Sequence, residues 1–279
     1  MGPKLAFLRH DPGTVLAPGL FRSLAPGERK SGNLDVKYKF GDEQLHFVGR
    51  WPLGADDLRV LQGIVAHFGQ AGDMLDDPAM RAEIFADTKK DNGEDILIAD
   101  LSYRQIAQEV GYANIDDSKS IKESIKRLFS TTVFVSRGGE EVGYHLIETY
   151  KSCAAAGRVT IALNPRITVA VLGEGTRYAR IDMIEVREIK LDVTRLVHQR
   201  LSGWLNQGGE AKLDLETLKK YIWSNPPPDP KKAQNAEKKR NSQVRRALAE
   251  LQNLGWGVDE YQPRKFTIKR PGGHKLIAA

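Results

Sequence analysis

The sequence predicts an α+β fold in which two tandem winged helix-turn-helix domains are related by a pseudo-twofold repeat. Three helices followed by a two-stranded hairpin occur twice along the 279 residues, and this is the element order of a winged helix-turn-helix. In each half, the hairpin directly follows a basic helix. The predicted units are an N-terminal arm over 1–35, a first domain over 36–175 and a second domain over 176–279.

The composition is that of a globular protein that stays inside the cell. Charged residues make up 28% and apolar residues 41%, which supports a packed core and excludes global disorder. The single cysteine, Cys153, excludes an internal disulfide framework and a thiolate zinc site. No apolar run reaches the roughly 20 residues of a membrane span, and the first residues lack the apolar core of a secretion signal. We therefore expect a cytoplasmic protein.

The N-terminal part of the chain is expected to contain an arm, a hairpin and the first helix. Residues 1–35 are rich in Gly, Pro and Arg and show little periodicity, which predicts an extended arm. Residues 36–50 alternate in polarity on both sides of Gly41, as in a hairpin. Apolar residues at a spacing of three and four predict the first helix over 55–67.

Two further helices and a wing complete the first domain. Ser102 is suited to cap one helix, and either Ser118 or Ser120 is suited to cap the next. The extended runs 131–136 and 142–149, joined by two glycines, predict the wing.

A short segment links the two domains. Residues 158–163 predict a strand, and Asn164 and Pro165 then favour the start of a helix, because Pro suits the first helical position. Residues 177–181 predict a second strand, and Asp182 is suited to cap a short helix after it.

The second half repeats the order of three helices and a hairpin. The expected elements are helices over 191–205, after a cap at Asp214 and over 242–254, a Pro/Lys-rich linker over 224–239, and hairpin strands over 257–261 and 265–269.

Charge is distributed unevenly along the chain. The net charge of +6 favours an anionic partner only weakly. Residues 231–275, however, hold 12 Lys/Arg and 4 Asp/Glu, a net of +8, so the rest of the chain sums to −2. Residues 70–100 hold 9 acidic and 3 basic residues, and with few apolar residues they are expected to form an excursion from the core. The basic C-terminal unit is therefore the expected contact with the anionic partner.

The helix over 242–254 has the pattern of a helix that reads a DNA groove. If its apolar residues face the core, Ser242, Arg246, Ala249 and Asn253 lie on the opposite face. Arg can bind guanine O6 and N7, Gln and Asn can bind adenine, and Ala permits close approach. Upstream and wing cations can bind phosphates. The alternative is an ordinary solvated helix. The candidate DNA-binding residues here are Lys239, Arg240, Ser242, Gln243, Arg245, Arg246, Arg264, Lys265 and Lys269, with Lys238 and Arg270 beside them.

The third helix of the first domain offers a second, less distinctive basic face. Glu123 on that face can accept a hydrogen bond from cytosine N4, or it can form an i,i+3 surface pair with Lys126. The candidate DNA-binding residues of this helix are Lys119, Lys122, Lys126 and Arg127.

Enzymatic constellations are missing from the sequence. The six histidines show neither HxH nor HExxH spacing, and GxxxxGK[ST] does not occur. Asp56 and Asp57 are adjacent and suit the first turn of a helix, where they favour the helix dipole. We therefore expect no catalytic residues, no metal site and no cofactor, which argues against a nickase, primase or helicase.

Several stretches resemble one family. They are RHDPGTVLAPGLFRSLA at 9–25, LGADDLRVLQGIVA at 53–66, VTIALNPRITVAVLGEG at 159–175 and RIDMIEVREIKLDVTRLVHQRLSGWL at 180–205. They resemble the RepC replication initiators of IncQ-type plasmids, within the larger group of iteron-binding plasmid initiators.

The resemblance implies a function and its partners. The protein would bind directly repeated iterons in double-stranded DNA at a plasmid origin, help to open the adjacent AT-rich DNA and bring in a plasmid-encoded helicase. Monomers would bind iterons, and homodimers formed through the first domain would be inactive or repressor forms. The second winged helix would make the stronger base contacts.

Two rival functions follow from the same sequence. A transcriptional regulator would also bind DNA, and a single palindromic target with an effector pocket would favour it. An enzyme such as a primase or nickase would show a metal-dependent activity that is lost with a carboxylate.

Overall fold

The computed structural model describes residues 5–71, 73–74, 96–116, 118–153, 156–173, 177–223 and 233–272. The predicted α+β class is confirmed: helices combine with four antiparallel sheets in the described part of the chain. Most of the predicted acidic excursion and residues 224–232 of the predicted linker lie outside the described residues.

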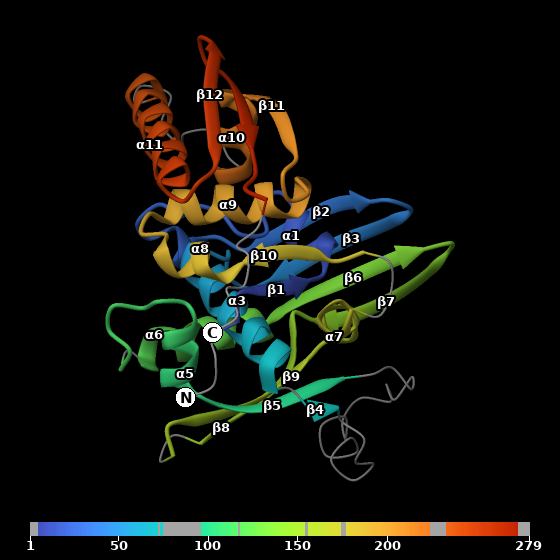
Figure 1. Cartoon of the computed structure of the whole chain (residues 1–279). Helices are drawn as coiled ribbons and strands as arrows, with labels where there is room; N and C mark the ends of the chain where they lie inside the picture. Colours follow the sequence, from blue (N-terminus) through green and yellow to red (C-terminus); the bar gives the residue numbers. More distant parts are fainter. Residues whose placement is uncertain are drawn as a thin grey trace.

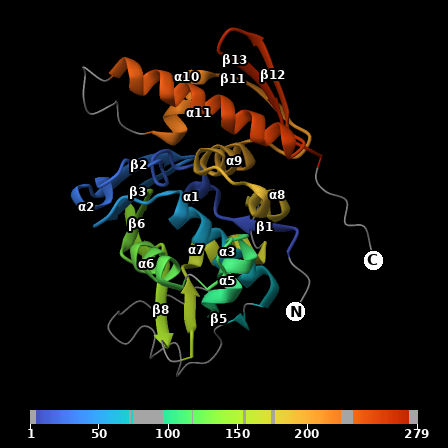
Figure 2. The same ribbon diagram turned by 90° about the vertical axis from the view of Figure 1, so that its left-hand side faces the viewer.

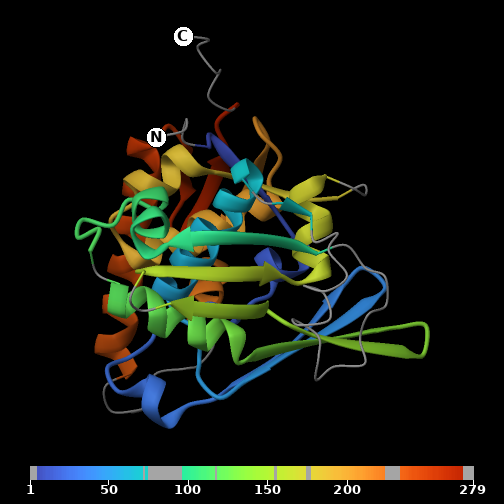
Figure 3. The same cartoon turned by 90° about the horizontal axis from the view of Figure 1, so that it is seen from below.

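One four-stranded sheet has the order β2-β3-β6-β7 and is built from two hairpins that extend away from the body (Figures 1 and 3). Both turns place Gly at positive φ, 63° at Gly41 and 61° and 92° at Gly138 and Gly139, a conformation that other residues rarely adopt. Both hairpins were predicted from the sequence. The strands are β2 (Leu34–Phe40), β3 (Glu43–Gly49), β6 (Thr131–Arg137) and β7 (Glu140–His145).

A second four-stranded sheet, with the order β4-β5-β9-β8, lies at the lower end of the molecule in Figure 1 and faces the viewer in Figure 3. Residues 158–163 form a strand as predicted, and β8 was partly anticipated. Strand β5 was missed: residues 97–100 were assigned to the acidic excursion, but Leu97 and Ala99 are buried at 2% and 6% exposure, because β5 pairs with β9. The strands are β4 (Asp73–Met74), β5 (Leu97–Ser102), β8 (Ile147–Cys153) and β9 (Arg158–Leu163).

Helices pack between and beside these sheets, and the caps predicted at Ser102 and Asn164 are confirmed. Ser118 and Ser120 both lie within their helix, so a cap at either of them stays a prediction. Ser102 forms a capping box with Gln105, and Asn164 accepts a hydrogen bond from the Ile167 N–H at 2.9 Å. Gly173 ends its helix in the left-handed region, with φ 74°. The helices are α3 (Ala55–Ala71), α5 (Tyr103–Glu109), α6 (Ser118–Phe129) and α7 (Pro165–Leu172).

The prediction that residues 1–35 form an extended arm is wrong for the described part, from residue 5 onward. Strand β1 (Phe7–His10) pairs with β10 (Ala179–Asp182), and α1 (Pro12–Leu16) and α2 (Glu28–Ser31) follow β1. Leu8 and Leu20 are buried at 1% and 0% exposure. The low periodicity did not indicate these elements because they are short. Short helices and strands are stabilised by tertiary packing more than by the periodicity of their own sequence.

The C-terminal unit, which comprises β11, α10, α11, β12 and β13, lies at one end of the molecule, above α9 (Figures 1 and 2). Its sheet has the order β11-β13-β12, and α10 and α11 cover one side of that sheet. The bounds are α8 (Met183–Glu188), α9 (Asp192–Trp204), β11 (Glu210–Asp214), α10 (Leu215–Ile222), α11 (Ala233–Asn253), β12 (Gly257–Gln262) and β13 (Lys265–Lys269).

Two predictions about the second half need correction. Residues 233–239 belong to helix α11 and not to a linker, so the helix predicted over 242–254 begins two and a half turns earlier. The pseudo-twofold repeat stays a prediction, and strand pairing differs between the two halves: β11 pairs with the hairpin of its own half, whereas β5 pairs with β9. The domain boundaries stay predictions, because one cluster of buried apolar side chains runs from Leu8 to Ile268.

Candidate nucleic-acid interface

Helix α11 presents the polar face that its periodicity predicts. Val244, Ala247 and Leu251 are fully buried. The opposite face is exposed and is composed of Ser242, Arg246, Ala249 and Asn253, with Lys238 and Lys239 in the preceding turns. Among the described residues, no carboxylate pairs with the guanidinium of Arg246. This face therefore offers one unpaired guanidinium at the middle of a 21-residue helix.

The β12–β13 hairpin, here called the wing, lies along one flank of α11. Arg245 binds Glu260 of β12 through two contacts, Nη1–Oε2 at 2.5 Å and Nη2–Oε1 at 2.8 Å, and lies over the ring of Phe266. Gln252 donates to the Val258 carbonyl at 2.9 Å. Of the two neighbouring arginines predicted to read DNA, Arg245 thus contacts the wing, whereas Arg246 is exposed.

The N-terminal segment lines the other flank of α11. Residues 22–28 and α11 line an open cleft with a volume of about 580 Å³. Arg22 is paired with Glu28 there, and Arg240 lies over the indole of Trp223 with its Cζ 5.1 Å from the ring centroid. Lys239 and the half-buried Gln243 complete the lining. Sequence reasoning missed this contribution, because nothing local in residues 22–28 indicates a neighbour more than 200 residues away.

The predicted cations of the wing divide into exposed and buried groups. Arg264, Lys265 and Lys269 are exposed, and Arg264 occupies the wing turn at φ 65°. Arg270 is 5% exposed and donates to the Ser202 and Leu205 carbonyls at 2.6 and 2.7 Å. A role for Arg270 in phosphate binding is therefore wrong, because its guanidinium satisfies carbonyls at the end of α9.

The predicted basic face of α6 is largely engaged within the protein. Lys126 pairs with Glu123 at 3.1 Å, which is the i,i+3 pair considered above. Lys122 lies over the ring of Tyr103, with its Nζ 4.9 Å from the centroid. Lys119 is exposed. This face is therefore less available to DNA than the face of α11.

Arg127 is held in a buried cluster and is unavailable to DNA, which corrects its assignment. Its side chain is 12% exposed and contacts Asp57 at 2.7 Å and Asp56 at 3.2 Å. Arg29 binds the same two carboxylates from α2. Asp57 is fully buried, and burial together with the adjacent Asp56 raises its pKa. The cluster joins α2, α3 and α6, so Asp56 and Asp57 do more than cap a helix.

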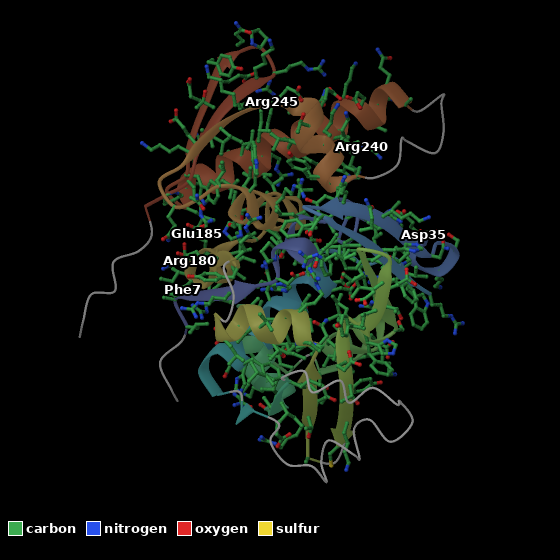
Figure 4. The ribbon with its side chains drawn as sticks, turned by 90° about the vertical axis from the view of Figure 1, so that its right-hand side faces the viewer. Phe7, Asp35, Arg180, Glu185, Arg240 and Arg245 are labelled. Atoms are coloured by element: carbon green, nitrogen blue, oxygen red, sulfur yellow. The ribbon has the colours of Figure 1, made fainter. Side chains whose placement is uncertain are left out.

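A buried polar network anchors the C-terminal unit. Glu185 of α8 accepts hydrogen bonds from His198 Nε2 at 2.7 Å and from Trp256 Nε1 at 2.9 Å. Burial alone would raise the pKa of Glu185, but these donors and nearby Arg270 lower it overall. Ser202 contacts the same His198 nitrogen as the carboxylate, at 3.4 Å, so the three side chains lack the relay of a catalytic triad. Figure 4 shows Glu185 at the junction below the C-terminal unit.

The described residues contain no group of three or more His, Cys, Asp or Glu side chains that could hold a metal ion. In the same residues, no helix has the length and apolar character needed to cross a bilayer.

Comparisons with known proteins place this geometry in a family. No curated protein matches the chain. Two solved structures of domains 2 and 3 of RctB resemble it in fold. The first has a TM-score of 0.54 and 10% sequence identity, and the match covers 92% of this chain and 97% of the RctB chain. The second has a TM-score of 0.53 and 9% identity, and the match covers 90% of this chain and 95% of the RctB chain. The family model for replication protein C matches residues 3–272. Because that match spans nearly the whole chain, the protein belongs to the replication protein C (RepC) family of replication initiators.

Proposed function

We propose that this initiator binds directly repeated iterons in double-stranded DNA at a plasmid origin, with α11 in the major groove and the β12–β13 hairpin on the flanking backbone. The exposed face of α11 around Arg246 carries this proposal, because it joins groove-reading side chains to a local net charge of +8 over residues 231–275. Lys265 and Lys269 extend the basic surface onto the wing.

In this proposal the C-terminal unit acts as a winged helix-turn-helix. The order α10, α11, β12, β13 supports it, and β11 adds a third strand to the hairpin. The unit around α5, α6 and the β6–β7 hairpin would act as the second winged helix, with Lys119 as an exposed predicted contact. Two such units on one chain suit a non-palindromic direct repeat bound by a monomer.

Origin opening and helicase recruitment belong to the same proposal. Binding to many adjacent repeats can deform and melt AT-rich DNA without hydrolysis by this chain. A plasmid-encoded helicase would then load, and homodimers away from DNA would be inactive or repressor forms. This function requires the cytoplasm, where plasmid DNA lies.

Footprinting on the DNA that flanks the gene tests the proposal. We expect regular protection at intervals of about 20–22 bp, which is two helical turns. Protection of a single palindrome would instead identify a transcriptional regulator.

We expect Lys269→Ala to weaken binding to all DNA sequences to a similar extent. Loss of one phosphate contact flattens the plot of log affinity against log salt by about one unit. Gel shifts on repeat and control DNA over a salt series measure the slope. Lys39→Ala is the control, since Lys39 is exposed on β2 in a different sheet. An unchanged slope for Lys269→Ala removes Lys269 from the contact surface.

We further propose that the protein is not an enzyme. Purified protein with Mg²⁺ should neither hydrolyse ATP nor cut or prime DNA. Turnover that co-purifies with the protein and is lost on substitution of a carboxylate would contradict this.

A further inference from the structure

Glu260 of the wing holds the predicted DNA-reading residue Arg245. Both carboxylate oxygens contact the guanidinium, at 2.5 and 2.8 Å, in the bidentate geometry that gives strong, oriented pairs. Glu260 Oε1 also accepts the backbone N–H of Arg264 at 2.7 Å, in the turn of the wing. The carboxylate thus joins the middle of α11 to the tip of the hairpin.

Both side chains lie at the surface and not in the core. Arg245 is 47% exposed and Glu260 is 32% exposed. The hydrogen bonds from Arg245 and from the Arg264 N–H lower the pKa of Glu260 to about 2, so the carboxylate is charged at every physiological pH. A fixed negative charge therefore lies between the groove-reading helix and the basic wing.

We propose that Glu260 is a specificity-determining residue, which competes with DNA phosphates for Arg245 and lowers the affinity for non-specific DNA more than the affinity for the repeat. The inference rests on the proposed function, because it takes the α11 and wing surface as the DNA-binding face.

Electrostatics gives the reason for this asymmetry. Non-specific binding depends almost entirely on phosphate contacts, so a carboxylate that occupies the guanidinium of Arg245 reduces it directly. Binding to the repeat also draws on base contacts from the rest of α11, which the carboxylate does not oppose. A repulsive element that penalises the wrong partner is a general route to specificity.

Glu260→Gln tests the proposal, with Asp259→Asn as the matched control. Both variants remove one negative charge from β12, but the side chain of Asp259 is exposed and has no hydrogen-bond or ion-pair partner among the described residues. We expect Glu260→Gln to raise affinity for control DNA and to steepen the salt slope by about one unit, so that the gain shrinks about fourfold between 50 and 200 mM salt. The ratio of repeat to control affinity should fall, whereas Asp259→Asn should change it little.

The double variant Arg245→Gln with Glu260→Gln identifies the route. If Glu260 acts through Arg245, the double variant should have the same DNA affinity as the single variant Arg245→Gln, because removal of the carboxylate has no further effect once the guanidinium is gone. The proposal is overturned if Asp259→Asn reproduces the gain, or if the gain persists without Arg245. It is also overturned if Glu260→Gln only lowers repeat affinity, as loosening of the wing would do.

These outcomes are separable from failure of the proposed function. Wild-type protein that binds repeat and control DNA equally would contradict iteron recognition. Glu260 would still be judged by the affinity and salt slope on control DNA.

Discussion

Arg246→Ala should weaken binding to the repeat by about 1–3 kcal/mol, or roughly 5- to 160-fold, and should relax preference at one base position. Arg246 is exposed at the middle of α11, opposite the fully buried Val244 and Leu251. A free guanidinium can donate to guanine O6 and N7 without first leaving a partner in the protein. Gel shifts with single-base variants of the repeat measure both the loss and the position.

The control for this prediction is Lys37→Ala, which removes an exposed positive charge from β2. The circular dichroism of both variants should match that of the wild type, because neither side chain is buried. If Arg246→Ala binds every repeat variant with wild-type affinity, α11 is not the recognition helix. If all DNA is weakened equally, Arg246 contacts a phosphate.

Glu185→Ala should lower the free energy of unfolding by about 3–5 kcal/mol, because it removes the charged partner at the centre of a buried network. His198 Nε2 and Trp256 Nε1 would both lose their acceptor, and an unpaired buried donor carries its full desolvation cost. Urea unfolding followed by Trp fluorescence and by circular dichroism measures the change. Glu188→Ala, an exposed position on the same helix, should change stability little. Equal stabilities of the two variants would contradict an anchoring role for Glu185.

The same network predicts the sign of the pH dependence. Because the pKa of Glu185 is lowered in the folded protein, its contribution is present above the ordinary glutamate pKa and is lost as the pH falls through the lowered value. Glu185→Ala should therefore lack that part of the acid dependence.

Local elements were predictable because their signals lie within a few residues. Asn164 followed by Pro165 marks a helix start, and paired glycines between alternating runs mark a hairpin. The same applies to the apolar stripe of α11, which periodicity alone assigns to the core. The elements missed were short ones such as β1 and β11, whose pairing partners lie more than 50 residues away.

The sequence by itself determined the helices after residue 55, the hairpins, the basic C-terminal unit and the resemblance to one family. Only the tertiary structure decided which arginines remain free. Arg127 is held by acids of α3, Arg270 by carbonyls at the end of α9, and Arg245 by Glu260 of the wing. The physical reason is that a guanidinium sits on a long side chain and has five N–H donors. Groups far apart in the chain can accept from these donors, and only the folded structure shows which guanidinium groups already have partners.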